Sequence, residues 1–224
     1  TESESYNYKG EFLDISLNKN IVDELGIGKF IKPFQLPHPE IAISLKNPNS
    51  MTATLAGKKG WIPISGNFVD AKDISTHWPT YKDGANSVGG KVSSNKWRVG
   101  RSVLITSNKA EAEDIINDPE GVFSHYFLYL NTVGKLASGT LGKDIKLVDE
   151  LPEAMQKAKD LIIIGNEKTV TEKLVHFIDT VGPFGTLLLT GHDMTNTEEL
   201  WKNSFTAMSQ SIQPILSKYM EQKF

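Results

Sequence analysis

Short apolar runs alternate with polar turns along most of the chain. The pattern is clearest in residues 41–67, where an apolar run gives way to a polar turn and then to apolar positions at helical spacing (Met51, Leu55 and Ala56). Gly60 follows two lysines, which is typical of the last turn and left-handed cap of a helix. The pattern therefore predicts a strand, a helix ending at Gly60 and a second strand over residues 61–65.

The same alternation continues to the end of the chain. It predicts further strands at 97–106, 161–165 and 184–190 and helices at 109–117, 169–181 and 197–219. Thr169 and Glu172 have the spacing of a capping box, so the second of these helices is expected to open there. Pro79 is expected to interrupt a partly helical segment that begins at Val69, and a loop is expected from Gly84.

Two segments depart from this rhythm. Residues 6–15 predict a short hairpin around a Lys-Gly turn, and the glycines and prolines of residues 21–40 predict an extended lead-in. Residues 118–160 form a long insertion with an aromatic cluster, expected to be a lid or substrate wall, although a plain connection is the alternative.

Regular strand–helix alternation predicts an α/β fold with parallel strands and helical crossovers. We expect residues 1–224 to form a single domain. Its parts are a hairpin and lead-in (1–40), strand–helix units (41–117), the insertion (118–160), and a final unit with a closing helix (161–224).

Composition excludes several classes of protein. The formal net charge of -3, with both signs mixed throughout, disfavours nucleic acid as a partner. The absence of cysteine excludes disulfides and thiolate chemistry. No apolar run reaches the roughly 18 residues needed to cross a bilayer, and no signal peptide is visible, so we expect a cytoplasmic protein without a membrane partner. The chain begins with Thr, which suggests a fragment or a processed chain.

Polar side chains follow the carboxyl ends of the predicted strands. These ends run into residues 44–50, 65–67, 106–108 and 190–193, which are rich in hydroxyl, amide and imidazole groups. Parallel α/β folds bind ligands at this edge of the sheet. Turn chemistry alone also enriches Ser, Asn and Gly at such positions, so a purely structural reading stays open.

Several segments in series resemble the bacterial luciferase-like flavin monooxygenases, in particular the limonene monooxygenase group. They are residues 41–68, THWPTY at 76–81, WRVGRSVLITS at 97–107, LIIIGNEKTVTEKL at 161–174 and VGPFGTLLLTGHDM at 181–194. The resemblance implies a TIM (β/α)8-barrel fold and places this chain's strands as the fifth to the eighth. The first four strands have no counterpart, so the resemblance implies an incomplete barrel.

The resemblance also implies a place for the flavin phosphate. In the family it lies in the loop after the fifth strand and at the following helix N-terminus, and the matching positions are Asn49, Ser50 and Thr52. Free N–H groups and the helix dipole favour an anion there. Ser44 and Lys46 are added as further cofactor contacts. The alternative is that Asn47 or Asn49 merely caps the helix.

The redox chemistry would belong to the flavin, so side chains are candidates for proton transfer and hydrogen bonding. We select His192 at the end of the last strand, with His125 and Tyr126 of the insertion. Either histidine could instead be a turn or packing residue. The remaining candidates are expected to line the substrate pocket: Ser65, Asn67, Arg98, Ser102, Phe123 and Phe127.

Arg98 and Arg101 are separated by an odd number of residues, so they cannot share a face of one strand. Arg98 shares its face with Ser102, and we expect that face to line the pocket. His38, His77 and His176 have no ligand spacing, so no metal site is predicted, and the four tryptophans are expected to pack in the core.

Three functions remain open. The resemblance implies an FMN-dependent monooxygenase, or its C-terminal part, that oxidises a small apolar organic substrate with O2 and receives reduced flavin from a reductase. The second is a non-catalytic flavin-binding half-barrel that self-associates, because an open sheet leaves unpaired edges. The third is a deazaflavin (F420)-dependent oxidoreductase.

Overall fold

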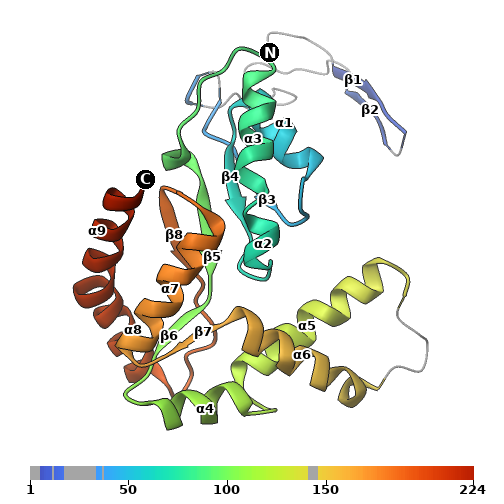
Figure 1. Cartoon of the computed structure of the whole chain (residues 1–224). Helices are drawn as coiled ribbons and strands as arrows, with labels where there is room; N and C mark the ends of the chain where they lie inside the picture. The colour runs from blue at the N-terminus through green and yellow to red at the C-terminus, as the bar shows by residue number, and fades with distance from the viewer. Residues whose placement is uncertain (1–5, 12, 18–33, 37, 141–145) are drawn as a thin grey trace, which may run out of the picture. The chain divides into compact units, whose positions relative to one another are not determined.

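The computed structural model describes residues 6–11, 13–17, 34–36, 38–140 and 146–224 (Figure 1). The chain divides into two units, Thr1–Glu40 and Ile41–Phe224. In the first unit, β1 (Tyr6–Lys9) and β2 (Asp14–Leu17) form an antiparallel hairpin, as predicted. Most of the predicted lead-in lies outside the described residues.

The second unit is built on a parallel four-stranded sheet (Figure 1). Its strands are β3 (Ala42–Leu45), β4 (Ile62–Ser65), β5 (Arg98–Arg101) and β8 (Thr186–Leu189), paired in that order. All three pairings are parallel, which confirms the predicted α/β class. Neighbours in the sheet follow one another in chain order, with only β6 and β7 left out.

These two remaining strands form a small sheet of their own. β6 (Val103–Ile105) continues β5 beyond a break at Ser102 and pairs in parallel with β7 (Ile163–Gly165). The carbonyl of Arg101 accepts from Thr190 N, whereas that of Ser102 accepts from Ile163 N. Successive carbonyls of a strand point to opposite edges, so β7 lies on the edge opposite β8 and does not separate β5 from β8.

The helices follow the predicted strands. They are α1 (Met51–Lys59), α2 (Ala71–Ile74), α3 (His77–Asn86), the short 3-10 helix η2 (Ser94–Lys96), α4 (Lys109–Asn117), α5 (Val122–Ala137), α6 (Leu147–Leu161), α7 (Glu167–Val181), α8 (Glu198–Ala207), the π-helical turn η3 (Met208–Ile212) and α9 (Gln213–Lys223). α1 ends as predicted, because Gly60 adopts the left-handed conformation with φ 67.

Three boundaries differ from the prediction. α3 runs through Pro79 to Asn86 because this proline is the third helical residue, where the missing N–H has no intrahelical partner to lose. α7 begins at Glu167 and is capped by Asn166, whose side chain accepts from Thr169 N, so the cap predicted at Thr169 is wrong. The insertion forms the helices α5 and α6, which the sequence pattern did not reveal.

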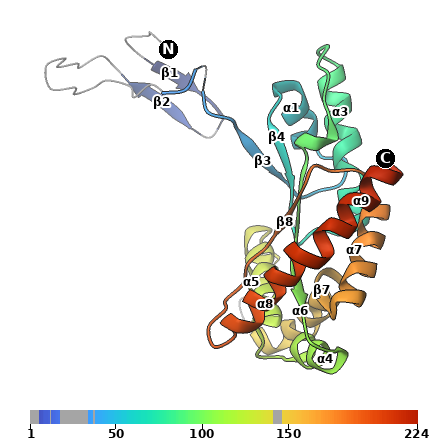
Figure 2. The ribbon, with the colours of Figure 1, turned by 90° about the vertical axis from the view of Figure 1, so that its left-hand side faces the viewer.

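The two faces of the four-stranded sheet differ. Residues paired across parallel strands share a face, so Ser65 and Leu187 lie with Val99 on one face. Helices α1, α3, α7 and α9 lie on that side of the strands (Figure 2). Its core contains Val99, Val103, Leu174, Phe177 and Ile212, together with the buried Trp97. We call it the helix side.

The opposite face is only partly covered. It carries Ala42, Ser44, Ile62, Ile64, Arg98, Gly100, Thr186 and Leu188. Most of these side chains are exposed or half-buried. Beyond the break in the long strand, Leu104 and Ile164 pack against Phe123, Phe127 and Trp201 of α5 and α8, so the insertion covers the carboxyl end of this face. We call it the open face.

Within the described residues, none of the helices combines the length and the apolar composition needed to cross a membrane.

Candidate functional site

Four side chains at the carboxyl end of the sheet form one hydrogen-bond network. Tyr126 Oη donates to Asn67 Oδ1 at 3.1 Å, and Asn67 Nδ2 donates to Ser102 Oγ at 3.1 Å. Ser102 Oγ lies 2.8 Å from His192 Nε2. Tyr126 comes from α5, Asn67 follows β4, Ser102 lies at the break in the long strand, and His192 follows β8. We call these residues the Asn67 network; all four were candidates from the sequence.

His192 is surrounded by aromatic rings. Phe123 and Tyr126 approach its ring edge-on, with centroids 5.0 and 4.9 Å away, and the Trp201 ring centroid is 5.9 Å away. Burial lowers the pKa of His192 from its ordinary value of 6.5, so the imidazole is neutral at physiological pH. The aromatic surroundings therefore keep the His192 imidazole neutral, with one ring nitrogen that accepts a hydrogen bond and one that donates.

The positions of the hydrogens follow from the partners. Ser102 is fully buried, and its Oγ already accepts from Asn67, so its own hydrogen is directed to His192 Nε2. A neutral His192 that accepts at Nε2 carries its hydrogen on Nδ1. Within the described part of the chain Nδ1 has no partner. This N–H is therefore available to donate to a ligand.

Asn67 is held from the helix side as well. Arg101 is buried and donates from Nη1 to Asn67 O at 3.2 Å and from Nη2 to Val69 O at 3.1 Å. Its guanidinium lies 4.3 Å from the centroid of the Phe177 ring. Gly100 gives the turn room, because a Cβ there would lie 3.1 Å from Asn67 N. The turn that presents Asn67 is therefore fixed by the sheet beneath it.

The predicted phosphate positions lie in the β3–α1 loop (residues 46–50) and at the start of α1. Ser50 is the N-cap, and its hydroxyl accepts from Thr52 N at 3.1 Å. Asn49 adopts φ 49, and its N–H donates to Thr76 Oγ1 at 2.9 Å. The cap is thus Ser50 and neither Asn47 nor Asn49. Lys46 and Asn49 are exposed, so the loop is open to a ligand.

Ser65 belongs to a different cluster from the other pocket candidates. It lies on the helix side, where its Oγ is 2.8 Å from His77 Nδ1 and accepts from Trp97 Nε1 at 2.9 Å. The register explains this, since Ser65 pairs with Val99 of the helix-side core. His77 was not a site candidate from the sequence, because nothing in the sequence places a residue of α3 beneath the end of β4.

The structure brings some further candidates to the site. Phe123 and Phe127 are buried in the core beneath His192 and Tyr126. Ser44 lies on the open face near the carboxyl end of β3. The half-buried Arg98 also lies on the open face, but at the amino end of β5, four residues before Ser102. His125 is exposed on α5 and joins neither cluster.

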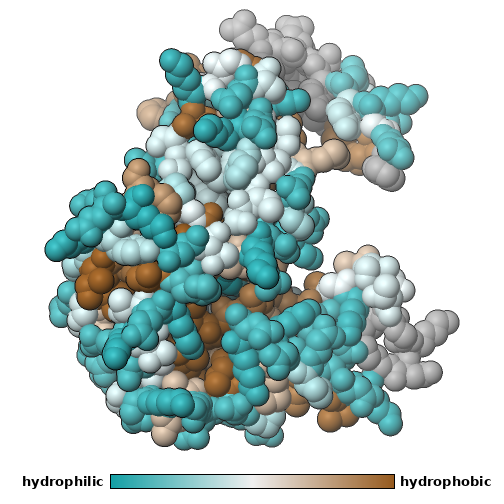
Figure 3. Space-filling view, viewed as in Figure 1, coloured by the Kyte–Doolittle hydropathy of each residue, from teal (hydrophilic) through white to brown (hydrophobic). Residues whose placement is uncertain are grey.

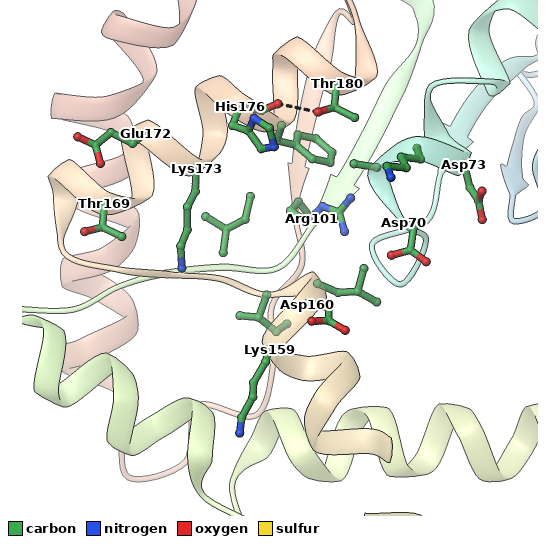
Figure 4. Close-up of a pocket in the computed structure, with 16 residues that line it drawn as sticks. Asp70, Asp73, Arg101, Lys159, Asp160, Thr169, Glu172, Lys173, His176 and Thr180 are labelled. Carbon is green, nitrogen blue, oxygen red and sulfur yellow. Dashed lines mark hydrogen bonds between the residues drawn. The ribbon is translucent and has the colours of Figure 1, made fainter. Parts of the chain in front are cut away.

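A large cleft lies elsewhere, on the helix side (Figure 4). It has a volume of about 880 Å³ between α2, the end of α6 and α7, and its floor is apolar at β7 (Figure 3). Arg101, Lys173 and His176 line it, with Asp70 and Asp160 on other walls. Figure 4 shows Arg101 and Lys173 pointing in different directions, so they do not converge on one ligand.

Among the residues that the structure describes, no group of three His, Asp or Glu side chains could hold a metal ion.

Two sequence relatives are monooxygenases. The 3,6-diketocamphane 1,6-monooxygenase of Pseudomonas putida is 24% identical over 218 residues, which cover 94% of this chain and 57% of the relative. The 2,5-diketocamphane 1,2-monooxygenase 2 of the same organism is 24% identical over 178 residues, or 78% and 49% of the two chains. The chain thus spans about half the length of these relatives. No protein-family model matches the chain.

Solved structures share the fold. The oxygenating constituent of 3,6-diketocamphane monooxygenase from Pseudomonas putida, a type II Baeyer-Villiger enzyme in complex with FMN, aligns with a TM-score of 0.62 at 24% identity. The alignment covers 94% of this chain and 58% of that enzyme. An F420-dependent secondary alcohol dehydrogenase aligns with a TM-score of 0.53 at 14% identity, over 91% and 56% of the two chains.

These findings confirm the resemblance to luciferase-like flavin-dependent monooxygenases that the sequence indicated.

Proposed function

We propose that this chain forms the carboxyl-terminal part of the ligand site of an FMN-dependent monooxygenase. The strands β3, β4, β5 and β8 are parallel and pair in the order in which they occur along the chain, with β6 and β7 in a separate sheet. Strands five to eight of a (β/α)8 barrel also pair in chain order. The open face then corresponds to the barrel interior, and the α5–α6 insertion to a wall at its mouth. The resemblance to the FMN complex of the Pseudomonas enzyme supports this placement.

The Asn67 network carries the proposal. It lies at the carboxyl edge of a parallel sheet, where α/β enzymes bind ligands, and it leaves a neutral imidazole with an unused N–H. Neutral hydrogen-bond donors in a ring of aromatic side chains suit the polar atoms of a flavin or of an oxygenated organic substrate. The substrate class that fits the apolar surroundings is a small apolar organic molecule, such as a cyclic ketone.

The β3–α1 loop would hold the phosphate of the cofactor. Asn49, Ser50 and Thr52 surround the N-terminus of α1, where the helix dipole favours an anion and the hydroxyls of Ser50 and Thr52 can donate to it. Lys46 adds a positive charge, and Ser44 lies two residues earlier, in β3 on the open face. FMN would supply the redox chemistry when bound in reduced form, and a separate reductase would provide it.

The open face also supports self-association. Its apolar residues include Ile64 and Leu188, and β3 and β8 are the two edge strands of the described sheet. Unpaired edges and uncovered apolar faces favour pairing with another half-barrel. A self-associating flavin-binding half-barrel without catalysis is therefore the second candidate.

Titration of the chain with FMN, followed by quenching of flavin fluorescence, tests the proposal. We expect saturable binding that His192→Phe and Ser102→Ala weaken, while His125→Phe, on the exposed side of α5, leaves it unchanged. Absence of binding at high micromolar FMN would refute the proposal. Tighter binding of F420 than of FMN would favour the deazaflavin alternative.

Two further measurements separate the enzyme from the binding module. Reduced FMN with 3,6-diketocamphane and O2 should give oxygenated product if the chain is catalytic. The mass in solution should exceed that of the 24.8 kDa chain if half-barrels pair. Flavin binding with a dimer mass but without product would select the non-catalytic module.

A further inference from the structure

A buried chain of hydrogen bonds runs under the sheet to the β3–α1 loop. Trp97 Nε1 donates to Ser65 Oγ at 2.9 Å, and Ser65 Oγ lies 2.8 Å from His77 Nδ1. His77 Nε2 lies 3.1 Å from Asn47 O. Trp97, Ser65 and His77 are all fully buried, whereas Asn47 is exposed. The bonds therefore connect the core to a loop at the ligand edge.

Both ends of this chain fix the directions of its bonds. Indole N–H is only a donor and a carbonyl oxygen is only an acceptor, so His77 Nε2 must carry a hydrogen. Burial lowers the pKa of His77, so the ring is neutral, and Nδ1 accepts from the Ser65 hydroxyl. Every donor and acceptor in this series of hydrogen bonds, from Trp97 to Asn47, is then satisfied. No other tautomer achieves this.

The β3–α1 loop is also held at a second point by the same region. Thr76, immediately before His77, accepts from Asn49 N at 2.9 Å and donates to Asp73 O at 2.7 Å. Asn49 has a positive φ of 49, a conformation that few residues other than Gly, Asn and Asp adopt readily. Two adjacent residues at the start of α3 thus determine the backbone path between β3 and α1.

We propose that His77 is a positioning residue for the phosphate end of the cofactor. It acts through Asn47 O and, with Thr76, holds the β3–α1 loop in the conformation that presents Ser50 and the N-terminus of α1. This inference rests on the proposed FMN function. It adds that phosphate recognition depends on a buried histidine that never touches the ligand.

Two substitutions at position 77 separate this role from packing. The amide of Gln can reach the position of Nε2 and donate to Asn47 O, whereas that of Asn reaches only the position of Nδ1. Both variants remove the ring. In His77→Asn we expect the FMN dissociation constant to rise roughly 3- to 10-fold, the effect of one hydrogen bond, with His77→Gln close to wild type. Riboflavin, which lacks the phosphate, should bind all three proteins equally.

Thr76→Val supplies an independent test, because it keeps the side-chain shape but removes the hydroxyl that accepts from Asn49 N–H and donates to Asp73 O. We expect a similar selective loss of FMN over riboflavin. A proportional loss of both flavins, or equal behaviour of His77→Asn and His77→Gln, would overturn the inference. Urea unfolding of each variant verifies that the measured protein is folded.

Amide hydrogen exchange distinguishes failure of the inference from failure of the proposed function. In the ligand-free chain, residues 49–54 should exchange several-fold faster in His77→Asn than in wild type, while α7 is unchanged. Unchanged exchange in residues 49–54 would refute the positioning role of His77. Absence of FMN binding by wild type, with faster exchange in the variant, would refute only the proposed function and the phosphate assignment.

Discussion

Replacing Arg101 by methionine should destabilise the chain by about 3 kcal/mol, although it removes a buried charge. Arg101 is 2% exposed and donates to the carbonyls of two buried residues, Asn67 and Val69. Removal of a donor that leaves a buried acceptor unpaired costs about 1–3 kcal/mol. The cation–π contact with Phe177 contributes about 0.5–2 kcal/mol more. Methionine keeps much of the apolar stem, so little cavity is added.

One effect opposes this loss. Burial lowers the pKa of Arg101 to about 10, with a nearby Asp70 raising it in part, so the cation is retained at neutral pH at some desolvation cost. Met removes that cost, which is why we expect less than the sum of the individual contributions. The desolvation free energy that the variant recovers is smaller than the free energy it loses, because the two carbonyls remain buried without a donor in the variant.

Urea unfolding followed by circular dichroism measures this difference. The midpoint should fall while the slope m stays constant, because the extent of unfolding is unchanged. Arg98→Met is the matched control, since Arg98 lies on the same strand but is half-buried on the open face and has no hydrogen bond among the described residues. A loss below about 1 kcal/mol for Arg101→Met, or an equal loss for Arg98→Met, would refute the reasoning.

Three further predictions follow from local geometry. Gly84→Ala should destabilise by more than about 2 kcal/mol, because its Cβ would lie 2.2 Å from Thr54 O between α3 and α1; Gly134→Ala, with no atom within 4 Å, should be neutral or stabilising in the same urea assay, and equal effects would contradict the packing argument. Tyr126→Phe should cost about 1 kcal/mol through its bond to Asn67, and Tyr129→Phe, on the exposed side of α5, close to nothing. Burial lowers the pKa values of His77 and His192 below 6.5, so the unfolded chain binds protons before the folded chain does as the pH falls. The urea midpoint should therefore be constant above about pH 6.5 and decrease below it. A midpoint that increases as the pH is lowered from 7 to 5 would show that neither histidine is buried neutral.

The strands were predictable because each is a short apolar run between turn residues. β3, β4, the long strand 98–105, β7 and β8 all lie where the pattern placed them. The insertion was harder, because an aromatic cluster does not by itself distinguish helix from loop. α5 is fixed by packing of Phe123 and Phe127 against α6 and α8, which is a tertiary effect.

The location of the site at the carboxyl edge of the sheet was predictable from the sequence, but the contacts between its side chains were not. Placement of polar residues after the strands identified Asn67 and His192, and the strand face shared with Arg98 identified Ser102. The structure joins these three by hydrogen bonds. Parity along one strand could not assign Ser65, because its face depends on the register with β5. His77 was missed because its partners are 12 and 30 residues away in sequence.

The long strand 98–105 takes part in two sheets, and this has a consequence for the order of folding. Its first half pairs with residues 186–189, and its second half with residues 163–165. Arg98 pairs with Thr186 and Val103 with Ile163, separations of 88 and 60 residues, so closing the first contact costs slightly more chain entropy. The pairing of α5 with α6 is local, and helical hairpins form quickly. We therefore expect the insertion and β7 to form early, and β8 to dock last, completing the ligand edge in the final step.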